Sequence, residues 1–415
     1  MRERNPSVPV DRTRDTGALP VRRGTPAEVF AAFLKLGLTS FGGPIAHIGY
    51  FRRELVERRR WIDETEFARV LALCQFLPGP ASSQLGFSLG LLRAGWLGAL
   101  AAFAAFTLPS ALLLFAFAQV VPLLSGNVGQ ATIHGLKLVA VAVVAYGVLG
   151  MARALCPDAV RATIAAVAAA ATLVAGEAWT QVLVVVLGAL AGFVACRDVQ
   201  APSADASLRL AYGLRVGTAL LAAFALLLFG LPLAAHALDG ALSVFEAFYR
   251  AGALVFGGGH VVLPLLRESV VAPGWLSESD FLAGYGAAQA VPGPLFTLSA
   301  YLGARLVGVH GGALGACIAL VGIFLPGFLL VAGALPWWRS IGNAPLAARA
   351  VAGVNAAVVG LLGAALYDPV WTSAVRDRLD VAIVAIGFTL LAAWRASPIV
   401  VVAWCVAAAI ALGGP

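Results

Sequence analysis

The sequence predicts an all-α polytopic membrane protein made of two inverted-topology repeats with re-entrant helical hairpins. Three features predict it: an apolar composition, an internal repeat and an uneven distribution of arginines. Of the 415 residues, 60% are hydrophobic and only 12% are charged, whereas about 25% of a soluble domain is charged. Several apolar runs are about 20 residues long, which is enough for a helix to span the hydrocarbon core of a bilayer.

The N-terminal residues 1–26 are polar and rich in arginine. They lack the apolar core of a signal peptide, so we expect a disordered tail. Lys and Arg gather on the cytoplasmic side of membrane proteins, and this rule places the N-terminus in the cytoplasm. The net charge of +7 belongs to the same topological signal, and we expect no nucleic-acid partner.

An internal repeat covers most of the remaining chain. Each half carries, in order, an FGG motif, an Arg-Glu pair and a PGP motif, at 41–43, 53–54 and 78–80 in the first half and at 256–258, 267–268 and 292–294 in the second. Such self-similarity is the mark of a repeat architecture. We divide the chain into a tail (1–26), a first repeat (27–197), a linker with one connecting transmembrane helix (198–242) and a second repeat (243–415).

The first repeat begins with two predicted hairpins. One bends at the FGGP motif (41–44), and arginines flank both of its ends, which makes both ends cytoplasmic. The other covers residues 66–92 and bends at the PGP motif. Ordinary membrane spans are expected after it, near residues 95–121, 131–152, 161–176 and 179–196.

A single further span near 211–235 carries the chain to the other face, where the second repeat starts. Its loop 266–281 lacks the arginine cluster that follows the first hairpin, as an inverted repeat requires. After two more hairpins, spans are expected near residues 311–335, 346–367, 380–395 and 397–413. The result is nine crossings with four hairpins, or thirteen crossings if each hairpin crosses once.

The two PGP motifs break apolar segments at membrane depth. Proline lacks an N–H and disfavours a helical conformation in the residue before it. The glycines of the FGG motifs permit backbone conformations that break a helix. Irregular backbone within a membrane survives only where protein or a water-filled cavity covers it. A helix that restarts there presents free N–H groups, which attract anions, and transporters with inverted repeats bind substrate at such breaks. The alternative is that the motifs are structural kinks or close-packing sites.

The candidate substrate-binding residues lie at these breaks. Backbone N–H groups of Gly79, Ala81, Gly293 and Leu295 would bind an oxyanion, with help from neighbouring hydroxyl and amide side chains. Two repeat-equivalent cations in apolar segments would offset its charge, or would instead snorkel to the interface. The full set is Lys35, Ser40, Gly42, Gly43, Gln75, Gly79, Ala81, Ser82, Ser83, Arg250, Gly257, Gly258, Gln289, Gly293, Leu295 and Thr297.

Other chemistry has weaker support. Glu54 and Glu268 each follow an arginine, which favours ion pairing over a proton relay, a role weighed also for His47 and His260. The G-x-S-x-G pattern at 86–90 lies in an apolar segment, which favours helix packing over a hydrolase nucleophile. The five cysteines are scattered and form no CxxC or Cys/His cluster, so no metal site, cofactor or disulfide framework is expected.

Five motifs stand out together: FGGP (41–44), WID (61–63), QFLPGP (75–80), FGGG (256–259) and QAVPGP (289–294). As a set they resemble the chromate ion transporter family in its long, two-domain form, over residues 28–412. One difference separates the halves: the second has Gly259 where the first has Pro44. The two hairpin tips therefore need not be equivalent.

The resemblance implies a secondary transporter in the bacterial inner membrane rather than an enzyme. It implies export of chromate from the cytoplasm, and hence chromate resistance, with chromate or sulfate and the lipid bilayer as partners and no cofactor. Three alternatives stay open: transport of sulfate or another anion by the same architecture, an intramembrane enzyme, and a structural subunit that transports nothing. A homodimer is also left open.

Overall fold

The structure is a computed structural model of the chain. It describes residues 24–41, 43–124, 126–175, 178–199, 210, 212–235, 240–256, 259–307, 310–338 and 344–412. Most of the expected N-terminal tail lies outside the described residues, as do the candidate residues Gly42, Gly257 and Gly258. The described part of the chain forms helices and no strand, in agreement with the predicted all-α class.

The helices of the two halves follow the same order. The first half contains α1 (Pro26–Thr39), α2 (Gly43–Phe51), the π-helical η1 (Arg52–Arg58), α3 (Glu64–Phe76), α4 (Ala81–Val120), η2 (Val121–Leu123), α5 (Gly126–Leu155), α6 (Ala159–Ala175) and α7 (Ala178–Ala195). Helix α8 (Leu214–Ala235) connects the halves. The second half contains α9 (Ala241–Ala253), η3 (Gly259–Val261), α10 (Val262–Val270), α11 (Glu278–Ala288), η4 (Leu295–Thr297), α12 (Leu298–Arg305), α13 (Gly312–Ala334), η5 (Leu335–Trp337), α15 (Pro345–Ala365), η6 (Leu366–Trp371), α16 (Thr372–Ala374), α17 (Arg378–Ala392) and α18 (Pro398–Leu412).

The helices on either side of each PGP motif are too short to cross the membrane. Helix α4 is interrupted at Ala94 and Gly95, where Gly95 has a φ of +67°, so its first arm ends near Arg93. That arm, α3, α11 and α12 each reach at most about 20 Å at 1.5 Å per residue, whereas the hydrocarbon core is about 30 Å thick. These helices form the re-entrant hairpins that the sequence predicts.

Equivalent caps begin the two helices that lead into the PGP motifs. The Asp63 carboxylate accepts a hydrogen bond from the Glu66 amide at 2.7 Å, and the Ser277 hydroxyl accepts one from the Asp280 amide at 3.1 Å. A side-chain oxygen at this position satisfies an N–H group of the first helical turn that has no partner within the helix. The caps fix where α3 and α11 start, and therefore where each PGP turn falls.

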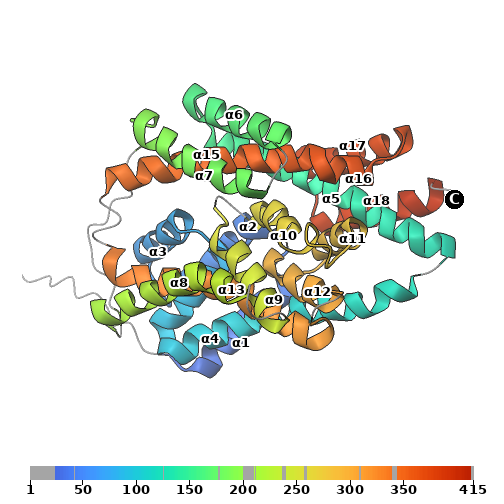
Figure 1. Cartoon of the computed structure of the whole chain (residues 1–415). Coiled ribbons are helices and arrows are strands. Elements are labelled where there is room, and N and C mark those ends of the chain that lie inside the picture. The colour runs from blue at the N-terminus through green and yellow to red at the C-terminus, as the bar shows by residue number, and fades with distance from the viewer. Residues whose placement is uncertain are drawn as a thin grey trace, which may run out of the picture.

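The two halves are interlocked. Helix α5 of the first half packs against α17 and α18 of the second, and α15 of the second half packs against α6 and α7 of the first. In Figure 1 these helices form one layer, and α1, α4, α8, α9, α12 and α13 form the opposite layer, with α2, α10 and α11 between them. Within that second layer, α1 packs on α4 and α9 packs on α13. The same pairings thus occur twice, once in each half.

The apolar helices agree with the predicted spans. Among the described residues, five helical segments are long and apolar enough to cross a membrane: Ala81–Leu123, Gly126–Leu155, Leu214–Ala234, Gly312–Trp337 and Pro345–Ala374. Shorter apolar helices are Ala159–Ala175, Thr180–Ala195 and Pro398–Leu412. The predicted spans coincide with the second arm of α4 and with α5, α6, α7, α8, α13, α15, α17 and α18.

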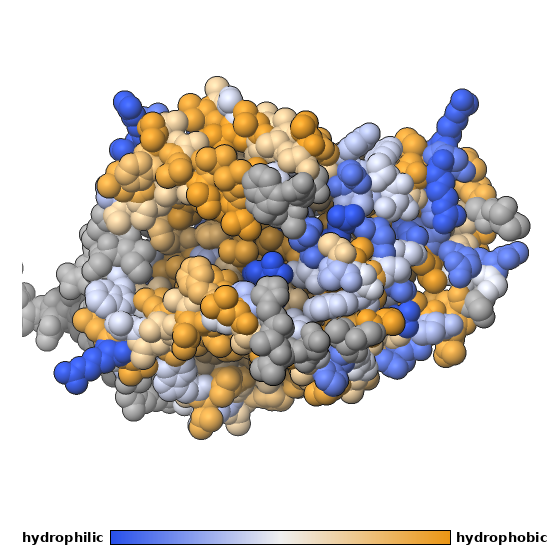
Figure 2. Space-filling view, in the orientation of Figure 1, coloured by the Kyte–Doolittle hydropathy of each residue, from blue (hydrophilic) through white to orange (hydrophobic). Residues whose placement is uncertain are grey.

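The outer surface is apolar as well. Helix α8 exposes Leu226, Phe229 and Leu233, each at least 72% accessible. Figure 2 shows hydrophobic side chains over both helical layers. Apolar surface of this extent is rare on a soluble monomer and suits a helix that faces lipid. The chain is therefore an all-α polytopic membrane protein.

Close helix packing explains the G-x-S-x-G pattern. A Cβ on Gly90 would lie 2.5 Å from the carbonyl oxygen of Gly98, and a Cβ on Gly86 would lie 3.0 Å from the Phe33 ring. Small residues let neighbouring membrane helices approach closely. The pattern is a packing feature, as predicted, and Ser88 between the two glycines is buried.

Candidate anion site

The four chain breaks pair crosswise between the halves. The Gly79 amide donates a hydrogen bond to the Val255 carbonyl at 2.7 Å, and the Gly293 amide donates one to the Ser40 carbonyl at 2.9 Å. Ser40 and Val255 are equivalent residues that immediately precede the Phe-Gly-Gly motifs. Each PGP turn is therefore held by the FGG break of the other half.

Both glycines of the PGP turns are required by their backbone and their surroundings. Their φ angles are +123° at Gly79 and +105° at Gly293, a region that side-chain-bearing residues rarely adopt. A Cβ on Gly79 would lie 2.8 Å from Nε2 of Gln84, and a Cβ on Gly293 would lie 2.8 Å from Oγ of Ser110. The Gln84 amide also donates to the Gly327 carbonyl at 3.0 Å, which adds a second bond between the halves.

This pairing corrects one part of the sequence-based prediction. The amides of Gly79 and Gly293 were expected to be free for an anion, but in this conformation both are bonded to carbonyls of the opposite half. The sequence could not show this, because the two partners of each bond lie in different halves. The turns shape the site here, and their glycine amides do not line it as open donors.

A cavity of about 380 Å³ lies where the first half's FGG break meets the second half's PGP turn. We call it the Arg395 cavity. It is lined, among others, by Phe41, Gly43, Tyr50, Tyr146, His260, Gln289, Val291, Gly293, Leu295, Arg395 and Ser397. Four predicted residues, Gly43, Gln289, Gly293 and Leu295, therefore come together around one space. The cavity combines a cation with hydroxyl and amide groups, the set that an oxyanion requires.

Sequence reasoning missed the cation of this cavity. Arg395 follows α17 and was assigned only to a loop between the last two spans. Its φ of +52° is uncommon for a residue other than glycine, and among the described residues no ion pair to it is seen. Tyr50 and Tyr146 were missed as well. Tyr50 lies on α2, which starts at the FGG break itself. Arg395 and Tyr146 come together at this break through packing of α17 and α18 on α5, for which the sequence carries no local signal.

The predicted hydroxyls are buried, with different partners. Thr297 donates to the Pro294 carbonyl at 2.7 Å and so stabilises the turn itself. Ser82 lies 3.4 Å from Nδ1 of His47. The hydroxyls of Ser40 and Ser83 have no hydrogen-bond partner among the described residues. Unpaired buried hydroxyls are uncommon, and these two lie next to the breaks, as predicted.

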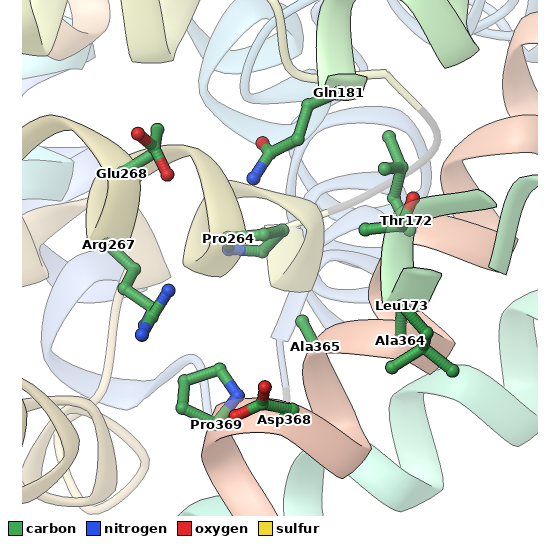
Figure 3. Close-up of a pocket in the computed structure, with 11 residues that line it drawn as sticks. Thr172, Leu173, Gln181, Pro264, Arg267, Glu268, Ala364, Ala365, Asp368 and Pro369 are labelled. Atoms are coloured by element: carbon green, nitrogen blue, oxygen red, sulfur yellow. The ribbon is translucent and has the colours of Figure 1, made fainter. Parts of the chain in front are cut away.

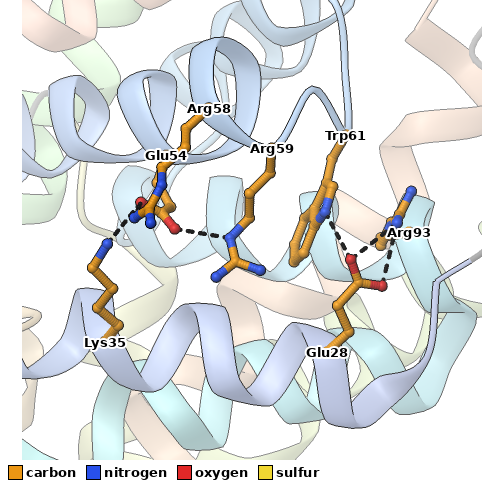
Figure 4. A network of polar contacts seen from close by, with 7 residues as sticks. All are labelled: Glu28, Lys35, Glu54, Arg58, Arg59, Trp61 and Arg93. Atoms are coloured by element: carbon orange, nitrogen blue, oxygen red, sulfur yellow. Dashed lines mark hydrogen bonds and ion pairs between the residues drawn. The ribbon is translucent and has the colours of Figure 1, made fainter.

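The two predicted cations are already neutralised. Lys35 lies 2.9 Å from the Glu54 carboxylate, and Arg250 lies 2.8 Å from Glu246. Glu54 also forms ion pairs with Arg58 and Arg59 (Figure 4). Ion pairing of Glu54 is confirmed, although its partners are not the neighbouring arginine.

Three further candidates lie outside the Arg395 cavity. Gln75 is exposed and lines a separate cavity of about 240 Å³ beside Asn355. Ala81 begins α4, where first-turn N–H groups have no partner within the helix. The ion pair predicted for Glu268 with its neighbour is absent from the described part of the chain, because Arg267 pairs with Glu278 at 2.9 Å.

One family profile matches both halves of the chain. The chromate transporter family profile matches residues 27–193 and 242–412. A chromate transport protein of Pseudomonas aeruginosa is 31% identical over 395 residues, covering 94% of this chain and 92% of the relative. A relative from Synechococcus elongatus named "Probable chromate transport protein" is 32% identical over 336 residues, covering 80% and 82%. A chromate transport protein of Cupriavidus metallidurans is 29% identical over 339 residues, covering 80% of each.

No solved structure matches the chain. The profile covers both halves and most of the helices described above. Relatives about as long as this chain align along most of it. The chain therefore belongs to the chromate transporter family.

Proposed function

We propose that this chain is a secondary transporter, without enzymatic activity, that exports chromate from the cytoplasm across the bacterial inner membrane. The Arg395 cavity carries the proposal, since it joins a cation and polar donors to backbone breaks from both halves. Family membership and the names of the relatives support chromate as the substrate. Efflux is part of the proposal and follows from the family resemblance. A cytoplasmic N-terminus is also part of it and follows from the arginine distribution.

In this proposal the anion binds in the Arg395 cavity. The guanidinium of Arg395 offsets charge and donates in a planar fork suited to an oxyanion. The hydroxyls of Tyr50 and Tyr146 and the amide of Gln289 supply neutral donors. Gly43 has a φ of +76°, which lets backbone approach the substrate without a side chain between them.

The remaining predicted residues have indirect roles in anion binding. Gly79 and Gly293 hold the turns, with Ser40 as partner of the second one. Ser82, Ser83 and the Ala81 amide lie at the start of α4, behind the first turn. Lys35 and Arg250 lie outside the Arg395 cavity, and we assign them to opening and closing of the transporter.

Sulfate transport is the second candidate, because sulfate is also a tetrahedral dianion and would meet the same donors. The test is uptake of labelled chromate and labelled sulfate into inside-out vesicles, with and without an imposed proton gradient. Efflux predicts that inside-out vesicles accumulate chromate. Accumulation only by right-side-out vesicles would overturn the direction, and stronger transport of sulfate would overturn the substrate.

Arg395→Gln tests the site itself. Loss of a charged hydrogen-bond donor should lower chromate uptake at subsaturating concentration by about tenfold or more. The matched control is Arg378→Gln, which removes an exposed arginine at the other end of α17 and should leave uptake unchanged. Equal uptake by both variants and the unmodified chain would exclude Arg395 as a ligand.

An enzymatic function would need a nucleophile, and Ser88 is the residue to test. It is buried, and the two glycines beside it serve packing. Ser88→Ala should keep chromate uptake, whereas Gly79→Ala should lose it. The opposite pattern would favour the intramembrane enzyme.

A further inference from the structure

The two halves differ in whether one repeat-equivalent ion pair is formed. By the repeat, Lys35 corresponds to Arg250 and Glu54 corresponds to Glu268. In the first half the pair is closed: Lys35 and Glu54 are 2.9 Å apart and bridge α1 to η1. Glu54 is only 6% exposed, and two arginines complete its coordination.

In the second half the same two positions line a space. A cavity of about 460 Å³, which we call the Arg250 cavity, has Arg250, Leu254, Pro264 and Glu268 in its wall. Arg250 pairs instead with Glu246, one turn back on its own helix. The bridge from α9 to α10 that would match the first half is therefore open.

The other charged groups around Glu268 are either already paired or negatively charged like Glu268 itself. Glu268 also lines a smaller adjoining cavity of about 100 Å³ with Gln181 and Asp368. Figure 3 shows Arg267 and Glu268 leaving α10 in opposite directions, and Arg267 pairs with Glu278. Within the described ranges no ion pair to the Glu268 carboxylate is seen, so Arg250 is the cation placed to take it.

The Arg250 cavity and the Arg395 cavity share repeat-equivalent walls on one side. Val143 and Tyr146 of α5 line the Arg395 cavity, and Val358 and Leu361 of α15 line the Arg250 cavity. The wall contributed by the α17–α18 connection in one is contributed by α7 in the other. Cavities with repeat-equivalent walls are expected where inverted halves alternate between two arrangements.

We propose that the Arg250 cavity is the second access site for the tetrahedral oxyanion, at the opposite end of the transport path, and that Arg250 and Glu268 form its gate. The proposal rests on the proposed transport function. When the halves exchange arrangements, the Arg250–Glu268 pair closes and the Lys35–Glu54 pair opens. An oxyanion in the Arg250 cavity competes with Glu268 for the guanidinium and so keeps this gate open.

State-dependent cross-linking tests the exchange. In a chain whose five cysteines are replaced, Lys35→Cys/Glu54→Cys and Arg250→Cys/Glu268→Cys are treated in vesicles with a short bifunctional thiol reagent. The cross-linked peptides are quantified by mass spectrometry. Glu246→Cys/Arg250→Cys is the matched control, because both residues lie on α9 and their separation does not depend on the gate.

The expected result is reciprocal. The first pair should cross-link more than the second without substrate, and Glu54→Gln, added to the Arg250→Cys/Glu268→Cys variant, should raise the yield of the second pair. The control pair should stay constant. Insensitivity of the second pair to Glu54→Gln would overturn the gate.

A charge reversal gives a second test that needs no cysteine removal. Glu268→Arg should lower chromate uptake by about tenfold, and Arg250→Glu/Glu268→Arg should restore most of it. Failure of the double variant to recover, in protein of normal abundance, would overturn the pair. If the unmodified chain moves neither anion, the transport function fails instead, and the Glu54→Gln cross-linking result still decides whether the gate exists.

Discussion

At the scale of single residues, Gly79 and Gly293 do two things that no other residue type can do together. They adopt a positive φ, and they leave room for Gln84 and Ser110 where a Cβ would be. The sequence predicted their importance from the flanking prolines. It assigned their amides to the anion, whereas the amides hold the opposite half.

Gly79→Ala and Gly293→Ala should each destabilise the chain by more than about 1 kcal/mol and reduce chromate uptake severely. The physical reason is the strained φ together with the close contact. Gly150→Ala is the control, since Gly150 lies within helix α5 and a Cβ there meets no atom within 4 Å. Thermal unfolding in detergent and vesicle uptake measure the two effects. A melting temperature unchanged in both PGP variants would contradict the prediction.

Glu54 predicts a dependence of stability on pH. It lies in the arginine-rich η1, outside the candidate spans. Burial by itself raises its pKa, but hydrogen bonds from Arg59, Lys35 and Arg58 outweigh burial and hold the pKa at about 2. Because the folded-state pKa is depressed, Glu54 stabilises the fold above its unfolded pKa of about 4.3 and loses this contribution as pH falls toward 2.

Glu54→Gln should therefore melt at a lower temperature than the unmodified chain at pH 7. The difference should shrink as pH is lowered from about 4 toward 2. Melting curves of both proteins in detergent across this range provide the measurement. A difference that stays constant over the whole range would show that the Glu54 charge is not what stabilises the fold.

At the scale of elements, the sequence predicted what local chemistry determines. Apolar length marked the spans, and the prolines and glycines marked the hairpin turns, because both effects act within one segment. The capping residues Asp63 and Ser277 act locally too. Local signals did not show that α17 and α18 pack on α5, and this packing brings Arg395 to a break more than 300 residues earlier in the chain.

Helix pairs in the second layer depend on equivalent glycines. A Cβ on Gly37 would lie 2.8 Å from the carbonyl oxygen of Ala105, and a Cβ on Gly252 would collide with that of Ile323. Gly37→Ala should separate α1 from α4, and Gly252→Ala should separate α9 from α13, so each should lower the melting temperature. Gly363→Ala, where a Cβ meets no atom within 4 Å, should not. Similar melting temperatures for all three variants would contradict this packing role.

At the scale of the whole molecule, neither half is complete by itself. The surfaces of α5 and α15 are each covered by helices from the other half. Two polypeptides, residues 1–199 and 210–415, should therefore be unstable when produced separately and stable when produced together. A tag on one half should recover the other after solubilisation. A well-behaved, monodisperse single half in detergent would contradict this interdependence.

The crossed hydrogen bonds between the breaks have a consequence for the leakage of ions across the membrane. A channel open to both faces at once would require the Gly79–Val255 and Gly293–Ser40 bonds to break together. Two amides and two carbonyls would then lose their partners within the hydrocarbon region, at a cost of several kcal/mol each. Because each bond ties one PGP turn to the opposite half, one of the two bonds can break while the other remains formed. In the proposed transporter, this arrangement would therefore oppose a leak of small ions across the membrane.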